Sequence, residues 1–131
     1  MITFTSTDTW VMLSLLFNQA TGGATLRDLI ATADYMNHAI LTYDELAGSL
    51  VRLMQAGYVD KQAARFCATP VIRSYYAKVT RPRRSINKDW QDVERFLQTT
   101  AVTEAAPRRA PSRVVARAAY ERAVRAYLSA V

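Results

Sequence analysis

The sequence predicts a mainly α-helical fold with one small β-hairpin, and residues 42–70 supply the clearest reasons for it. This stretch, TYDELAGSLVRLMQAGYVDKQAARFCATP, has the pattern of a capped helix, a glycine stop, two short strands and the start of another helix. Thr42 and Glu45 stand three residues apart, which is the spacing of a capping box. An apolar stripe then recurs at helical spacing and consists of Leu46, Leu50, Leu53 and Met54.

The hairpin is expected directly after this helix. Gly57 stands where a left-handed residue commonly ends a helix. Residues 58–62 form a strand-like run, and residues 65–68 are expected to return beside it after a turn that lacks glycine and asparagine. Thr69 can cap the next helix, with Pro70 at its first position, where a missing N–H costs nothing.

Two helices are expected before this stretch. The first should run from about Asp8 to Ala20, with Thr7 or Asp8 as its cap and a glycine pair at its end. It is apolar almost all round, which predicts burial on more than one side, and a second subunit could supply part of that burial. Residues 23–25 can form a short edge strand. Thr25 can cap the second helix, whose buried stripe is Leu26, Leu29, Ile30, Ala33 and Met36.

Two linkers and two helices make up the rest of the chain. Residues 81–84, Arg-Pro-Arg-Arg, form a basic linker, and Ser85 can cap the helix that follows. Residues 105–112 form a second linker, and the alanine-rich sequence after it is expected to be helical. We therefore divide the chain into a domain of residues 1–80 and a basic C-terminal helical extension of residues 81–131.

The first of these parts resembles the winged helix-turn-helix transcription regulators of the MarR-like and PadR-like kind. Those proteins share a helix that ends L…L…GY(I/V), a short wing and then LTPxGR. The matching residues here are Leu50, Leu53, Gly57, Tyr58, Val59, Thr69, Pro70 and Arg73. Ile72 stands where the pattern usually has glycine, so the subfamily is left open. The resemblance covers residues 5–80 and implies a mainly α winged helix-turn-helix with a small β wing, followed by two C-terminal helices.

The net charge of +6 is unevenly distributed. Residues 1–80 carry six basic and six acidic side chains, so that part is neutral. Residues 81–131 carry eleven basic and five acidic side chains and hold the whole excess. The electrostatic attraction for nucleic acid is therefore expected from the C-terminal part rather than from the winged helix.

The resemblance implies that the third helix enters the major groove of DNA. Asp44 and Glu45 lie at its start, where their carboxylates repel phosphates and are expected to stabilise the helix N-terminus instead. Base contacts are then expected from Arg52 and Gln55, with Gly48 on the same outward face.

Phosphate contacts are expected from the wing and the first linker. The residues are Lys61, Gln62 and Arg65 in the wing, and Arg81, Arg83 and Arg84 in the linker. Arg108 and Arg109 form a second, weaker cluster. Two alternatives stay open, since cations on exposed strands often serve solubility and charged linkers are often merely solvated.

The two C-terminal helices carry aromatic stripes that need a partner surface. We expect a homodimer, formed through Trp90, Val93 and Leu97 of one helix and Tyr120, Val124 and Tyr127 of the other. The competing interpretation is that both helices fold back on their own core.

The leading hypothesis is a cytoplasmic transcriptional regulator that binds double-stranded DNA as a homodimer. The runner-up is a winged-helix protein-interaction module without specific DNA binding, with the acidic start of the third helix and the aromatic helices as contact surfaces. A third option is an RNA or nucleoid binder that uses the arginine-rich tail non-specifically.

Enzymatic activity is not expected, because the sequence has no glycine-rich phosphate loop and no paired cysteines. His38 stands alone, so neither a metal nor a cofactor is expected. Cys67 is expected to be buried and inert, with a redox role as the weaker alternative. A single cysteine, the absence of a signal pattern and a longest apolar run of only Trp10 to Phe17 favour the cytoplasm and no membrane span.

Overall fold

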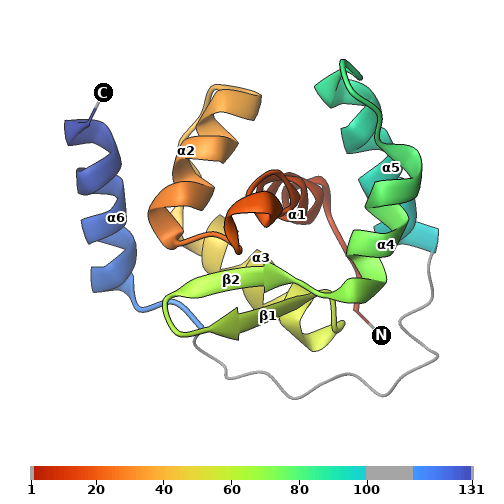
Figure 1. Ribbon diagram of the computed structural model, residues 1–131. Coiled ribbons are helices and arrows are strands. Elements are labelled where there is room, and N and C mark those ends of the chain that lie inside the picture. The colour runs from red at the N-terminus through yellow and green to blue at the C-terminus, as the bar shows by residue number, and fades with distance from the viewer. Residues whose placement is uncertain (1, 100–113, 131) are drawn as a thin grey trace.

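The computed structural model describes residues 2–99 and 114–130 of the chain (Figure 1). Within them the chain is mainly helical with one small antiparallel sheet, which confirms the predicted class. The helices are α1 Ser6–Phe17, α2 Leu26–Asn37, α3 Tyr43–Gln55, α4 Pro70–Val79, α5 Ile86–Thr99 and α6 Arg117–Ser129, and the strands are β1 Val59–Gln62 and β2 Arg65–Ala68. A short 3-10 turn, η1 Gln19–Thr21, follows α1.

The first three helices begin in the same way, with a threonine whose side chain accepts a hydrogen bond from the third helical N–H. The pairs are Thr5 with Asp8, Thr25 with Asp28 and Thr42 with Glu45, and each carboxylate accepts in return from the threonine N–H. These bonds satisfy backbone groups that the helix itself leaves free. The cap predicted at Thr25 and the capping box predicted at Thr42 are confirmed.

The predicted limits of the first helix are wrong at both ends. The helix begins at Ser6, because Thr5 is its cap and Asp8 is its third residue. It ends at Phe17, where the Asn18 side chain donates hydrogen bonds to Ser14 O and Thr32 Oγ1 and so leaves the helical path.

The sheet consists of β1 and β2, paired antiparallel from Val59 opposite Ala68 to Gln62 opposite Arg65. Ala24 adds a single bridge, in which its N–H donates to Phe66 O at 2.8 Å and its carbonyl oxygen accepts from Phe66 N–H at 2.7 Å. The edge strand expected at residues 23–25 is therefore reduced to one residue. The first strand begins at Val59 rather than one residue earlier.

Helix α1 lies at the centre of the molecule, with α2, α3 and α5 packed around it (Figure 1). Four of its apolar side chains have no exposed surface, namely Val11, Met12, Leu13 and Leu15. Burial on more than one side is confirmed, and the same chain supplies the covering. The core also includes Val93, Phe96 and Leu97 of α5 and Val115, so it spans the boundary drawn at residue 80.

Gly22 and Gly23 offer a matched pair of substitutions, since both have positive φ, +84° and +101°. A Cβ on Gly23 would lie 2.6 Å from Phe66 O and 2.7 Å from Cys67 Sγ, whereas a Cβ on Gly22 would meet nothing within 4 Å. Gly22→Ala should therefore lower the free energy of unfolding by about 1 kcal/mol through backbone strain alone, and Gly23→Ala by about 3 kcal/mol or more. Denaturant unfolding measures both losses, and equal losses would contradict the close approach at Gly23.

Candidate nucleic-acid interface

Arg52, the first predicted base contact, is half-buried and pairs with a fully buried carboxylate. Its Nη2 lies 2.7 Å from Asp8 Oδ1, and its Nε donates to the same carboxylate at 3.0 Å. Asp8 is fully buried and also accepts a hydrogen bond from Ser49 Oγ at 2.6 Å. The guanidinium therefore joins α3 to the start of α1, and two of its three nitrogens are not available to a base.

Gly48 leaves room for the Arg52 guanidinium in this pair. A Cβ at Gly48 would lie 3.3 Å from Arg52 Nη1, so the guanidinium lies against the bare backbone of the helix. Gln55 is half-buried near the end of α3. Of the base contacts predicted from sequence, Gln55 alone keeps a polar side chain that is not engaged by Asp8.

Residues 114–117 lie against the first turn of α3 at Tyr43, a contact that the sequence analysis does not predict. Val115 is only 2% exposed, and Tyr43 Oη donates a hydrogen bond to Val115 O at 2.6 Å. The Arg117 guanidinium lies 4.3 Å from the centre of the Tyr43 ring, a cation–π contact. A cavity of about 300 Å³ remains beside this contact, lined by Tyr43, Ala47, Gly48, Val51, Arg52, Val114 and Val115.

Residues 114–130, here called the C-terminal arm, include α6, which packs against α2 (Figure 1). Tyr120 Oη donates to Leu41 O, and Tyr127 Oη donates to Asp34 Oδ2 at 2.6 Å. Burial raises the pKa of Tyr120. The hydrogen bond to Asp34 raises the pKa of Tyr127, because it favours the protonated phenol.

The aromatic stripes predicted for dimerisation pack within the chain. Tyr120, Val124 and Tyr127 are half-buried against the core, and Val93 and Leu97 are buried beside α1. Trp90 is half-buried and lines a groove with Met36 and Ile86. These contacts correspond to the competing interpretation, in which both helices fold back.

The wing keeps its polar side chains at the surface. Lys61, Gln62 and Arg65 are all exposed. Arg65 Nη1 donates to Gly23 O at 3.3 Å and lies 3.7 Å from Asp28 Oδ2, so it is partly engaged. Lys61 Nζ lies 5.5 Å from the centre of the Phe66 ring.

The predicted basic linker is largely a cap for α4. Arg84 is 19% exposed, pairs with Asp92 and donates to Val79 O. Its Nε also lies 3.5 Å from Asp89 Oδ1. Arg81 Nη1 donates to the carbonyl oxygens of residues 78 and 80, where a cation complements the helix dipole. Arg83 is exposed, with a left-handed φ of 65°.

Two smaller predictions can be compared with the structure. Cys67 is half-buried rather than buried, because β2 alternates and sends Phe66 and Ala68 into the core while Cys67 lies on the other face. His38 is exposed and ends α2 with a left-handed φ of 54°. The Arg108–Arg109 cluster lies outside the described residues.

Residues 2–99 and 114–130 contain no group of three or more histidine, cysteine, aspartate or glutamate side chains that could hold a metal ion. None of the helices in this part of the chain is both long and apolar enough to cross a membrane. No protein-family model, no curated protein and no solved structure matches the chain.

Removing the arginine of the buried pair should destabilise the fold. Arg52→Met leaves the Asp8 carboxylate buried without its cation, and we expect a loss of about 2–4 kcal/mol in the free energy of unfolding. Gln55→Met, one turn along the same helix, should change it by about 0.5 kcal/mol or less. Denaturant unfolding of both variants gives the comparison, and a stable Arg52→Met protein would show that the pair is dispensable.

Stability should fall in alkali. Burial raises the pKa values of Tyr58, Tyr75 and Tyr76 above the ordinary 10.0. The unfolded chain therefore ionises first, so this contribution is complete below the unfolded pKa of about 10 and is lost as pH rises through the folded values. Denaturant midpoints from neutral to strongly alkaline pH measure the loss, which should be smaller in Tyr76→Phe. A flat profile would refute the prediction.

Proposed function

We propose that this chain is a winged helix-turn-helix protein that binds duplex DNA mainly through phosphate contacts. The order of elements supports the fold. Helices α1, α2 and α3 precede the β1–β2 hairpin, and the Ala24 bridge supplies the place of a third strand. In this arrangement α3 is the helix presented to the major groove and the hairpin is the wing.

The main support for the proposal is that most acidic side chains are engaged within the fold while most basic side chains are exposed. In the described residues the carboxylates are largely used inside the fold, in the capping boxes and in the pairs with Arg52 and Arg84. Among residues 2–99 and 114–130, only Asp44 and Glu121 are acidic and exposed. The same part of the chain has twelve exposed cations, namely Arg27, Lys61, Arg65, Arg73, Lys78, Arg81, Arg83, Lys88, Arg95, Arg117, Arg122 and Arg125. A surface of this kind favours a polyanion, through counterion release.

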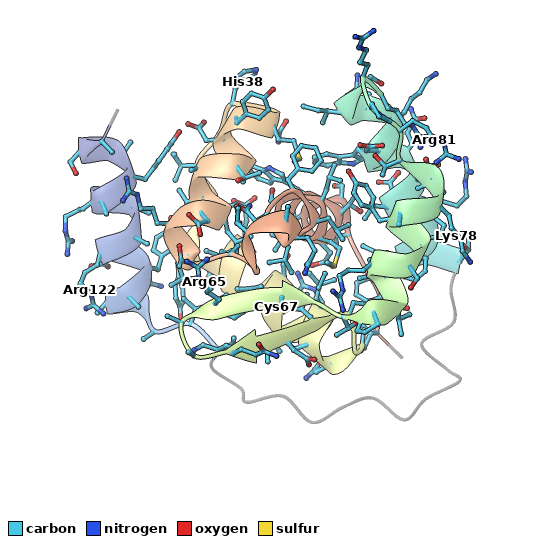
Figure 2. All side chains as sticks on the ribbon, in the orientation of Figure 1. His38, Arg65, Cys67, Lys78, Arg81 and Arg122 are labelled. Carbon is cyan, nitrogen blue, oxygen red and sulfur yellow. The ribbon has the colours of Figure 1, made fainter. Side chains whose placement is uncertain are left out.

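The cations lie on more than one side of the molecule. Lys78 and Arg81 lie beside α4, while Arg65 and Arg122 lie toward α6 (Figure 2). The wing cation Lys61 lines a cavity with Val114 and Val115, and Arg117 lies over the Tyr43 ring of α3. We assign a phosphate contact to Lys61 of the wing.

Sequence readout should be weak, because α3 offers few base-reading groups. Arg52 is bound to Asp8, and Asp44 repels phosphates at the start of the helix.

The unit that we propose is a single chain, since the stripes considered for a homodimer pack on the chain's own core.

A second function is favoured by one observation. The face of α3 already holds a polypeptide, residues 114–117, through a buried valine and a cation–π contact. A winged-helix protein-interaction module would use that face for a partner protein in place of DNA.

Duplex binding should be salt-dependent and sensitive to the wing. Fluorescence anisotropy of a labelled random duplex, titrated across a salt series, should give weaker binding and a salt slope smaller by about 1 for Lys61→Gln. The matched control is Lys88→Gln on α5, which lies across α1 from α6 (Figure 1). It should change both quantities less.

Asp44→Asn should bind more tightly than the parent chain, because it removes an exposed carboxylate from the start of α3. Absence of binding at low salt would reject the DNA proposal. Recovery of one stoichiometric protein partner in its place would favour the interaction module.

A further inference from the structure

The C-terminal arm and the DNA major groove need the same face of α3. The major groove is about 12 Å wide, and a helix with its side chains measures about 10–12 Å across. One helix therefore fills the groove. Residues 114–117 lie against the first turn of α3, where Tyr43 contacts both Val115 and Arg117, and Val114 and Val115 line a cavity with Gly48, Val51 and Arg52 of the outward face. With the arm in this position, α3 cannot enter the groove at its N-terminal end.

The arm is attached in a way that permits release. No residue of α6 is fully buried, and the helix rests on half-buried side chains. Three tyrosine hydroxyls hold the arm, Tyr43 to Val115, Tyr120 to Leu41 and Tyr127 to Asp34. Cavities of about 300 Å³ and 360 Å³ flank residues 114–115, and Val115 is the residue of the arm that is buried in the core.

The charge of the arm makes its release useful for DNA binding. The exposed charges of α6 are Arg117, Arg122 and Arg125 against Glu121. In the closed state Arg117 lies over the Tyr43 ring. Arg122 and Arg125 are already exposed, and release frees Arg117 from the Tyr43 ring, so the same movement uncovers α3 and adds one cation to the interface.

We propose that residues 114–130 are an intramolecular competitor of DNA, which occupies the recognition face of α3 and must leave it before α3 enters the major groove. This inference rests on the proposed DNA-binding function. The apparent affinity for duplex is then the affinity of the open chain reduced by the fraction of molecules that are open. Any change that weakens the arm contacts raises that fraction.

Single tyrosine substitutions in the full chain test the competition. Tyr127→Phe and Tyr120→Phe each keep the ring and remove one arm hydrogen bond, so each should tighten duplex binding by about two- to tenfold. The matched control is Tyr75→Phe, whose hydroxyl donates to Asp92 O between α4 and α5. It undergoes the same chemical change away from the arm and should leave the affinity unchanged.

Hydrogen exchange gives the second readout, on the chain with and without saturating random duplex. The amides of α6 should exchange faster in the DNA-bound chain and, without DNA, faster in the Tyr127→Phe chain than in the Tyr75→Phe chain. Equal DNA affinity in all variants, or an arm that stays protected when DNA is bound, would overturn the competition while leaving DNA binding intact. Absence of duplex binding in every chain would instead reject the proposed function, and the competition with it.

Discussion

The arrangement of this protein depends on one buried carboxylate. Asp8 accepts a hydrogen bond from the Thr5 N–H at 2.8 Å and so caps α1, while Arg52 and Ser49 bind the same group from α3. A buried charge without its partners costs several kcal/mol, so α1 and α3 are held in one register. That register fixes which face of α3 is turned outward, and thereby where the C-terminal arm lies.

Features that depend on neighbours in the sequence were predictable. The capping box at Thr42, the glycine stop at Gly57 and the strand of residues 65–68 follow from spacings of a few residues, and all three are present. The errors are also local and instructive. The predicted start of the first helix is wrong because Thr5 and Thr7 are both suitable caps, and only the contact of Thr5 with Asp8 distinguishes them.

The candidate site depends on pairings that local sequence does not reveal. Arg52 reaches a partner 44 positions away, and Tyr43 contacts a residue 72 positions away. The sequence contains one signal for the first of these pairings. Asp8 lies in a largely apolar helix, and a buried carboxylate needs a charged or hydrogen-bonding partner. The pairing of Arg84 has a similar signal, because Asp89 and Asp92 lie three residues apart on the helix that follows it. Exposed charge runs and buried pairs share the same residue types, so composition alone cannot separate them.

The distance along the chain between the arm and its docking surface has a consequence for folding. The contacts that hold the arm join residues 72, 79 and 93 positions apart, whereas the capping boxes join residues 3 apart. Contacts with such long separations form late, and a nascent chain emerges with its N-terminus first. Newly made molecules therefore pass through a stage in which α1, α2 and α3 exist and the face of α3 is bare.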